Sequence, residues 1–88
     1  MKKKIIGVLL TYNCENLVQK AINNIPFKEF DEVICSDDGS TDGTCDIVSK
    51  NDIKILKNKH KGYGGNLFSG MNEAFNMGAT HVIELHGD

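Results

Sequence analysis

The sequence predicts an α/β fold: a parallel sheet of about four strands in the order 3-2-1-4, with helices on both faces. Short apolar runs alternate along the chain with stretches whose apolar residues recur every three or four positions, the spacings of buried strands and amphipathic helices. Short connections between such elements imply right-handed crossovers and therefore parallel strands. The residues that follow each strand then meet at one edge of the sheet, where α/β proteins bind ligands.

The first half of the chain is predicted to contain two strands and two helices. Residues 4–11 form the first apolar run and residues 32–36 the second. Between them lies a helical pattern that Pro26 closes, because proline cannot donate a backbone hydrogen bond inside a helix. Its apolar stripe comprises Leu17, Val18, Ala21, Ile22 and Ile25. A short helix is expected over residues 41–49.

The second half is predicted to contain two further strands around a long helix. Residues 53–56 form the third strand and residues 80–85 the fourth. A polar loop over residues 57–65 leads into the helix, which Gly78 stops. The apolar face of this helix is expected to comprise Leu67, Phe68, Met71, Ala74 and Phe75.

The composition is typical of one small α/β unit. The 88 residues are 40% hydrophobic and 25% charged with one proline, so residues 1–88 are expected to form a single domain. The net charge of −2 argues against nucleic acid as a partner. The apolar run 5–10 is too short for a signal peptide or a membrane span.

The cysteines predict a reducing environment. Their number is odd and no Cys-x-x-Cys pair occurs, so neither a disulfide framework nor a structural zinc site is indicated. We expect Cys14, Cys35 and Cys45 to be small apolar fillers in a cytoplasmic protein.

Polar or aromatic residues follow each of the four predicted strands. They are Thr11, Tyr12 and Asn13 after the first strand, Asp37 and Asp38 after the second, the lysine- and glycine-rich loop 57–65 after the third, and His86, Gly87 and Asp88 after the fourth. Because four separate segments bring such groups to one edge of the sheet, we expect a ligand site there.

The polar stretch 36–44 can be interpreted as a helix cap that also faces a ligand or as a calcium loop. Helix capping accounts for one carboxylate of Asp37 and Asp38, and the other is expected to face the crevice, because adjacent residues on extended backbone point to opposite sides. A calcium loop is the alternative, since the pattern D-x-S-x-D-G from Asp38 imitates the first half of an EF-hand. Its twelfth position falls on Ser49 instead of glutamate, and a strand leads into it, which argues against calcium.

The loop before the long helix is a candidate phosphate site. The stretch Gly62-Tyr63-Gly64-Gly65-Asn66 could direct backbone N–H groups and the positive end of a helix at phosphate oxygens, and Lys59, His60 and Lys61 would add positive charge. A flexible solvated connection accounts for the spacing equally well. The pattern matches neither Gly-x-Gly-x-x-Gly nor the P-loop, so we expect neither an NAD site nor an ATPase site.

Asp88 is a candidate metal ligand. On its own it could simply start a turn. Placed opposite Asp38 across the crevice between the first and fourth strands, it could hold Mg²⁺ or Mn²⁺, which bind carboxylates together with phosphate oxygens.

Four short segments carry a resemblance to a known family. They are VLLTYNCE from Val8, VICSDDGSTDGT from Val33, GYGGN from Gly62 and ELHGD from Glu84. In order and spacing they resemble the N-terminal half of a family 2 glycosyltransferase of the GT-A fold, and they cover nearly the whole chain. The predicted sheet would then be the Rossmann-like half of a GT-A domain.

The resemblance implies binding of a nucleotide-diphosphate sugar, such as a UDP- or GDP-sugar. Thr11 and Tyr12 would line the base pocket, with the Tyr12 ring against the base. Asp38 would hydrogen-bond the base or the ribose, and the loop 61–66 would lie near the diphosphate. Asp88 would match the last aspartate of the Asp-x-Asp motif that binds Mg²⁺ or Mn²⁺.

This chain departs from that motif at His86, where the first aspartate often stands. The resemblance implies transfer of a sugar to an acceptor hydroxyl or a polyprenyl phosphate, as in the biosynthesis of cell-surface glycans. The catalytic base normally follows the position of Asp88. We therefore expect a truncated, donor-binding half with no catalytic residue of its own, which meets the inner face of a membrane only through a missing C-terminal part.

Two other functions stay open at this point. One is a nucleotide-binding module that is not an enzyme. The other is a sugar nucleotidyltransferase, which should show a glycine-rich basic loop after the first strand, whereas residues 11–15 contain neither glycine nor a basic residue. An open last strand also predicts self-association.

Overall fold

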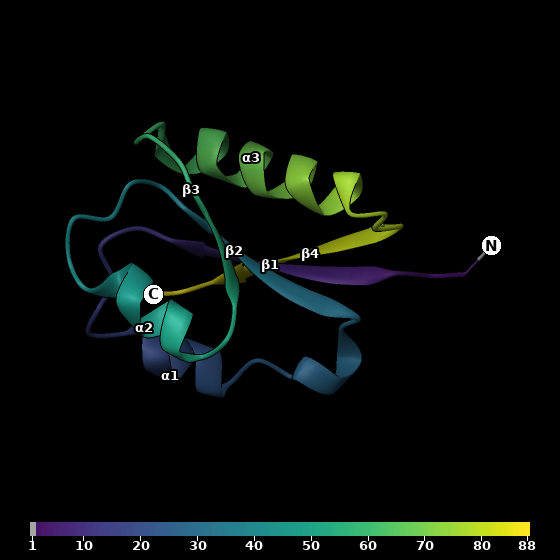
Figure 1. Ribbon diagram of the computed structural model, residues 1–88, viewed down its shortest axis with the longest axis horizontal. Coiled ribbons are helices and arrows are strands. Elements are labelled where there is room, and N and C mark those ends of the chain that lie inside the picture. The colour runs from purple at the N-terminus through teal and green to yellow at the C-terminus, as the bar shows by residue number, and fades with distance from the viewer. Residues whose placement is uncertain (1) are drawn as a thin grey trace.

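The computed structural model describes residues 2–88, and its sheet has the predicted topology (Figure 1). Four parallel strands lie in the order β3-β2-β1-β4. They are β1 (Ile5–Thr11), β2 (Glu32–Asp37), β3 (Lys54–Lys57) and β4 (His81–His86). Since all four run the same way, their carboxyl ends meet at one edge.

Helices cover both faces of the sheet, as predicted. The long helix α3 (Gly62–Asn76) lies on one face, and α1 (Val18–Asn23) and α2 (Thr44–Lys50) lie on the other (Figure 1). A short 3₁₀ helix, η1 (Phe27–Glu29), precedes β2 and was not predicted. Leu17, which the sequence assigned to the first helical stripe, precedes α1 and is 51% exposed.

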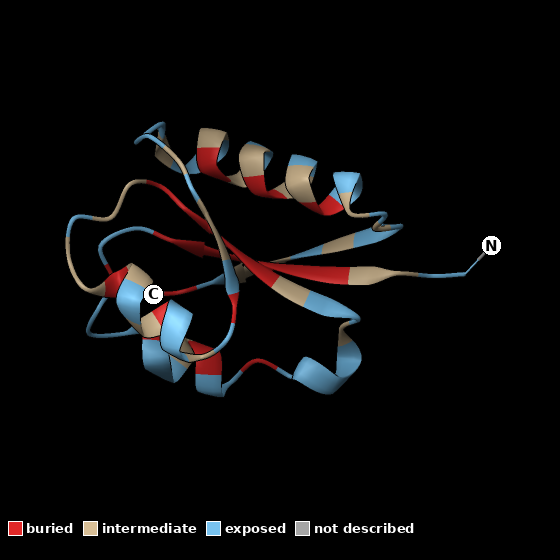
Figure 2. Ribbon diagram, viewed as in Figure 1, coloured by how far each residue is buried: buried red, intermediate tan, exposed pale blue. Residues whose placement is uncertain are grey.

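The central strand β1 is buried on both sides because its alternate side chains enter two cores. Val8 and Ala74 belong to the core under α3, whereas Leu9, Val18 and Val48 belong to the core under α1 and α2. The buried positions of β1 and β2 form the centre of the molecule (Figure 2). This continuous burial accounts for the unbroken apolar run at the start of the chain.

The helix α3 packs on the sheet through Leu67 and through small and polar residues rather than through its phenylalanines. The predicted face is wrong at Phe68 and Phe75, which are 71% and 50% exposed. The positions that α3 buries are Asn66, Gly70 and Ala74. A Cβ at Gly70 would lie 2.5 Å from Val8 Cγ1, so the absence of a side chain lets the helix approach the sheet.

Two helices begin at residues other than those predicted, because aspartates bind the backbone around them. The helix α2 begins later, at Thr44, since the Asp42 carboxylate accepts the Thr44 N–H and hydroxyl and holds the preceding residues in a turn. The helix α3 begins earlier, at Gly62, since the Asp38 carboxylate accepts the N–H groups of Lys61 and Gly62.

The last residue of β2 is a carboxylate with several internal partners. Asp37 is 1% exposed, and its Oδ1 accepts the hydroxyls of Thr11 and Ser40, each at 2.6 Å. Its Oδ2 accepts the backbone N–H groups of Gly39 and Ser40. Burial raises the pKa of Asp37, but the hydrogen bonds from Ser40 and Thr11 together outweigh burial and leave this pKa below its usual value.

The cysteines are free and buried or half-buried, as predicted. Cys14 and Cys35 are buried and Cys45 is half-buried. Burial raises the pKa of Cys35 to about 12 and that of Cys45 to about 11, so both remain thiols at neutral pH.

The outer strands of the sheet are β3 and β4. Ile83 on β4 is 45% exposed, and self-association stays a prediction. Within residues 2–88, no helix has the length and apolar character needed to cross a membrane.

Asp37→Asn should lower the free energy of unfolding by about 1–3 kcal/mol at pH 7, because it weakens a buried charged acceptor. The folded-state pKa of Asp37 lies below its unfolded value. Its stabilisation is therefore complete above about pH 4 and is lost as the pH falls through the folded pKa. Urea unfolding of both proteins at neutral and acidic pH measures this, and a difference that widens in acid would contradict it.

Gly70→Ala should destabilise the protein by about 1–3 kcal/mol, because the new methyl group would overlap Val8 and Ser36. Gly64→Ala is the matched control, since nothing lies within 4 Å of a Cβ there. The control should gain up to about 1 kcal/mol of helix propensity. Thermal unfolding measures whether each variant is less or more stable than the unaltered protein. A stabilised Gly70 variant would show that α3 does not approach the sheet so closely.

Candidate functional site

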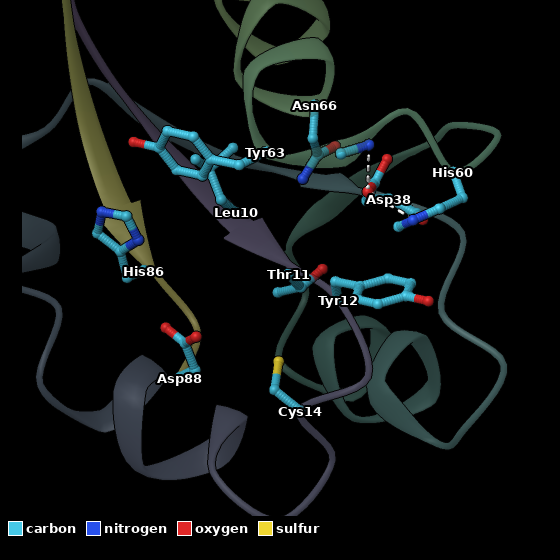
Figure 3. Close-up of a pocket in the computed structure, with 11 residues that line it drawn as sticks. Leu10, Thr11, Tyr12, Cys14, Asp38, His60, Tyr63, Asn66, His86 and Asp88 are labelled. Carbon is cyan, nitrogen blue, oxygen red and sulfur yellow. Dashed lines mark hydrogen bonds and ion pairs between the residues drawn. The ribbon is translucent and has the colours of Figure 1, made fainter.

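A pocket opens at the carboxyl edge of the sheet, between the ends of β1 and β4 and the start of α3 (Figure 3). The cavity measures about 250 Å³. The predicted site residues that line it are Thr11, Tyr12, Asp38, Gly62, Asn66 and Asp88. These come from four segments that are distant in sequence, and the parallel sheet brings them together at the predicted edge.

The remaining predicted site residues do not line this pocket. They are Asn13, Asp37, Lys61, Gly64 and Gly65. Asn13 supports the neighbouring loop, since its Oδ1 accepts the Thr41 N–H at 2.7 Å. Asp37 holds the turn after β2, and the two glycines lie in the first turn of α3. Their contact with a ligand stays a prediction.

Asp38 is a buried carboxylate of the pocket with three partners in the loop before α3 and at its start. It is 3% exposed. Its Oδ1 accepts the Lys61 N–H at 2.8 Å, and its Oδ2 accepts the Gly62 N–H at 3.0 Å. The Nδ1 of His60 lies 2.8 Å from the same Oδ2. One carboxylate thus binds the end of β2 to the loop that starts α3.

Tyr12 and His60 form an aromatic wall beside Asp38. Their ring centroids are 4.6 Å apart and their planes differ by 28°. Tyr12 follows β1 directly and is 48% exposed. Such a ring can stack on the flat face of a base.

Asn66 lines the pocket from the first part of α3 and has a supporting role. It is 4% exposed, and its Oδ1 accepts the Ser36 hydroxyl at 2.9 Å and the Asn58 amide at 3.1 Å. Its Nδ2 donates to the Ser36 carbonyl at 3.0 Å. Since both ends of the amide have partners, Asn66 positions α3 against β2.

The opposite wall of the pocket consists of a second aromatic pair. The rings of Tyr63 and His86 are parallel within 6°, with centroids 6.1 Å apart. Glu84 accepts the Tyr63 hydroxyl, and its Oε2 lies 2.9 Å from His86 Nε2. The hydrogen bond to Glu84 raises the pKa of Tyr63. His86 is thereby turned toward its own strand through one ring nitrogen.

Asp88 lies on the far side of the pocket from Asp38 (Figure 3). The Gly87 N–H donates to the Leu10 carbonyl at 2.9 Å, which holds this end of the chain beside β1. A Cβ at Gly87 would come within 2.8 Å of Thr11 Cγ2, so glycine allows this close approach.

Several lining residues were not among the predicted site residues. They are Leu10, Cys14, His60, Tyr63 and His86. Leu10 and Cys14 are apolar, so the sequence indicates the core for them rather than a binding site. His60 and Tyr63 lie within the polar loop 57–65 that was expected at this edge, but only Lys61 and the glycines of that loop were chosen as binding residues.

Comparison with known proteins agrees with the resemblance. The model of the family described as "Glycosyl transferase family 2" matches residues 8–83. The chain is also 28% identical over 107 residues to the UDP-N-acetylglucosamine--dolichyl-phosphate N-acetylglucosaminyltransferase of Methanococcus voltae. That alignment covers 100% of this chain and 43% of the relative, so the chain spans less than half of the relative's length. This protein belongs to glycosyltransferase family 2.

Proposed function

We propose that the pocket binds the nucleotide part of a nucleotide-diphosphate sugar, the donor in sugar transfer to an acceptor hydroxyl or a polyprenyl phosphate. One observation carries this proposal: Tyr12, Asp38 and Asp88, from the ends of three strands, line the same cavity. A ring for stacking, an acceptor for a base and a carboxylate for a cation are the groups that such a donor needs. The name of the Methanococcus voltae relative, with UDP-N-acetylglucosamine and dolichyl phosphate, supports this class of donor and acceptor.

The diphosphate would lie at the start of α3. This helix of 15 residues begins at Gly62, in the pocket wall, so its positive dipole end favours anionic groups there. Lys61 is exposed beside the same turn and adds a positive charge. Tyr12 and Asp38 would then bind the base of the donor.

The fit to Mg²⁺ or Mn²⁺ is partial and depends on the donor. Throughout the described residues, no three His, Cys, Asp or Glu side chains are grouped so that they could hold a metal. Asp88 would therefore bind the cation together with phosphate oxygens, as is common for Mg²⁺. When bound, such a cation neutralises charge on the departing diphosphate.

We further propose that the 88-residue chain binds the donor without transferring the sugar by itself. Among residues 2–88, the carboxylates that line the pocket are Asp38 and Asp88. Asp38 already binds the start of α3, and Asp88 is assigned to the cation, so neither is free to deprotonate an acceptor. Sugar transfer from a UDP- or GDP-sugar by the purified chain would contradict this part of the proposal.

Tyr12→Ala should weaken the binding of UDP or GDP about tenfold, since stacking of a base on an aromatic ring contributes about 1–3 kcal/mol. Phe27→Ala is the matched control, because Phe27 is also exposed but belongs to η1, away from the pocket. Isothermal titration with each nucleotide measures both variants. Equal affinities for the Tyr12 variant and the unaltered protein would remove Tyr12 from the base site.

Asp88→Asn should abolish the effect of Mn²⁺ on UDP binding. In the unaltered protein Mn²⁺ should tighten UDP binding, because Asp88 and the diphosphate would hold the cation together, whereas Mn²⁺ alone should bind weakly. Asp52→Asn, at an exposed turn outside the pocket, should keep the full effect of Mn²⁺. The same Mn²⁺ effect in the Asp88 variant would show that the cation binds elsewhere.

A further inference from the structure

The hydrogen-bonding capacity of Asp38 is nearly exhausted within the protein. An ionised carboxylate offers about four acceptor positions, two on each oxygen. The N–H of Lys61 uses one position on Oδ1. The N–H of Gly62 uses one position on Oδ2, and Nδ1 of His60, which lies 2.8 Å from the same oxygen, covers the other. One acceptor position, on Oδ1, is left for a ligand.

Among the partners of Asp38, His60 is the one whose contact comes from a side chain. It can therefore be substituted without removing a backbone N–H donor. Its side chain is 59% exposed, yet three contacts orient it. The ring lies on Tyr12 at 4.6 Å, and Nδ1 lies 2.8 Å from Asp38 Oδ2 and 3.3 Å from the Asp38 backbone carbonyl oxygen. An N–H at Nδ1 therefore faces the carboxylate and the carbonyl of Asp38 together, and it keeps other donors away from this side of Oδ2.

The hydrogen-bonding edges of the bases differ in how many acceptors they need. Uracil presents a single N–H donor between two carbonyl oxygens. Guanine presents two adjacent donors, N1–H and an amino hydrogen, which require both oxygens of a carboxylate. Cytosine and adenine place an acceptor nitrogen beside their amino group, and its lone pair would face the carboxylate. A donor left without a partner in a buried site costs binding free energy.

We infer that His60 is a specificity-determining residue, which leaves Asp38 with one free acceptor and thereby selects uracil over guanine. This inference rests on the proposed binding of a nucleotide donor in the pocket. Guanine would need the position on Oδ2 that His60 occupies. His60 therefore sets the choice of nucleotide through a carboxylate that it contacts, while Tyr12 stacks on either base.

The test compares UDP and GDP binding in two variants that separate the functions of the imidazole. His60→Phe keeps a ring on Tyr12 but removes the Nδ1 donor, whereas His60→Asn keeps an amide donor near Asp38 but removes the ring. The unaltered protein should bind UDP more tightly than GDP. His60→Phe should reduce this preference about tenfold, chiefly by tighter GDP binding, because the freed acceptor gains a charged hydrogen bond. His60→Asn should keep the preference.

His81→Phe is the matched control, since His81 is an exposed histidine at the other end of β4, and the variant should keep the preference. An unchanged ratio of UDP to GDP affinity in His60→Phe, or tighter binding of GDP by the unaltered protein, would overturn the role of His60 but not the proposed function. Failure of the unaltered protein to bind either nucleotide would instead overturn the proposed function. Circular dichroism of each variant establishes that it is folded.

Discussion

The carboxylate of Asp38 is the contact on which the pocket depends. It is buried at the end of β2 and accepts the backbone N–H groups of Lys61 and Gly62, so it decides where α3 begins. Without this acceptor, the partly buried N–H groups of Lys61 and Gly62 would lose their protein partner, which costs stability. The same side chain lines the cavity, so the contact that shapes the wall also presents the group that meets a ligand.

The two adjacent aspartates at the end of β2 have different functions. Asp37 points back to β1 through the Thr11 hydroxyl and stabilises the turn that follows. Asp38 points toward α3 and the pocket. Extended backbone places adjacent side chains on opposite sides, which is why neighbouring residues of one type serve a structural and a ligand-facing function.

The parallel arrangement of the strands and the edge that carries the site could be predicted from the sequence, because both follow from the alternation of apolar patterns and from the handedness of crossovers. The face that α3 packs against the sheet could not be predicted. Periodicity favours large apolar residues such as Phe68, whereas close approach to the sheet needs Gly70, and this preference depends on the distance between the two elements. The start of α3 was missed for a similar reason, since its capping residue, Asp38, lies 23 positions earlier than Lys61.

The proposed nucleotide site lies at the carboxyl edge of the sheet, around Asp38. Amide chemical-shift perturbation of the ¹⁵N-labelled chain during titration with UDP tests it most directly. The shift changes should concentrate at Tyr12, Asp38 and Gly62, whereas the amide signals of Thr80 and His81, at the opposite edge, should stay in place. Shifts that concentrate at the opposite edge, or no shifts at saturating UDP, would contradict it.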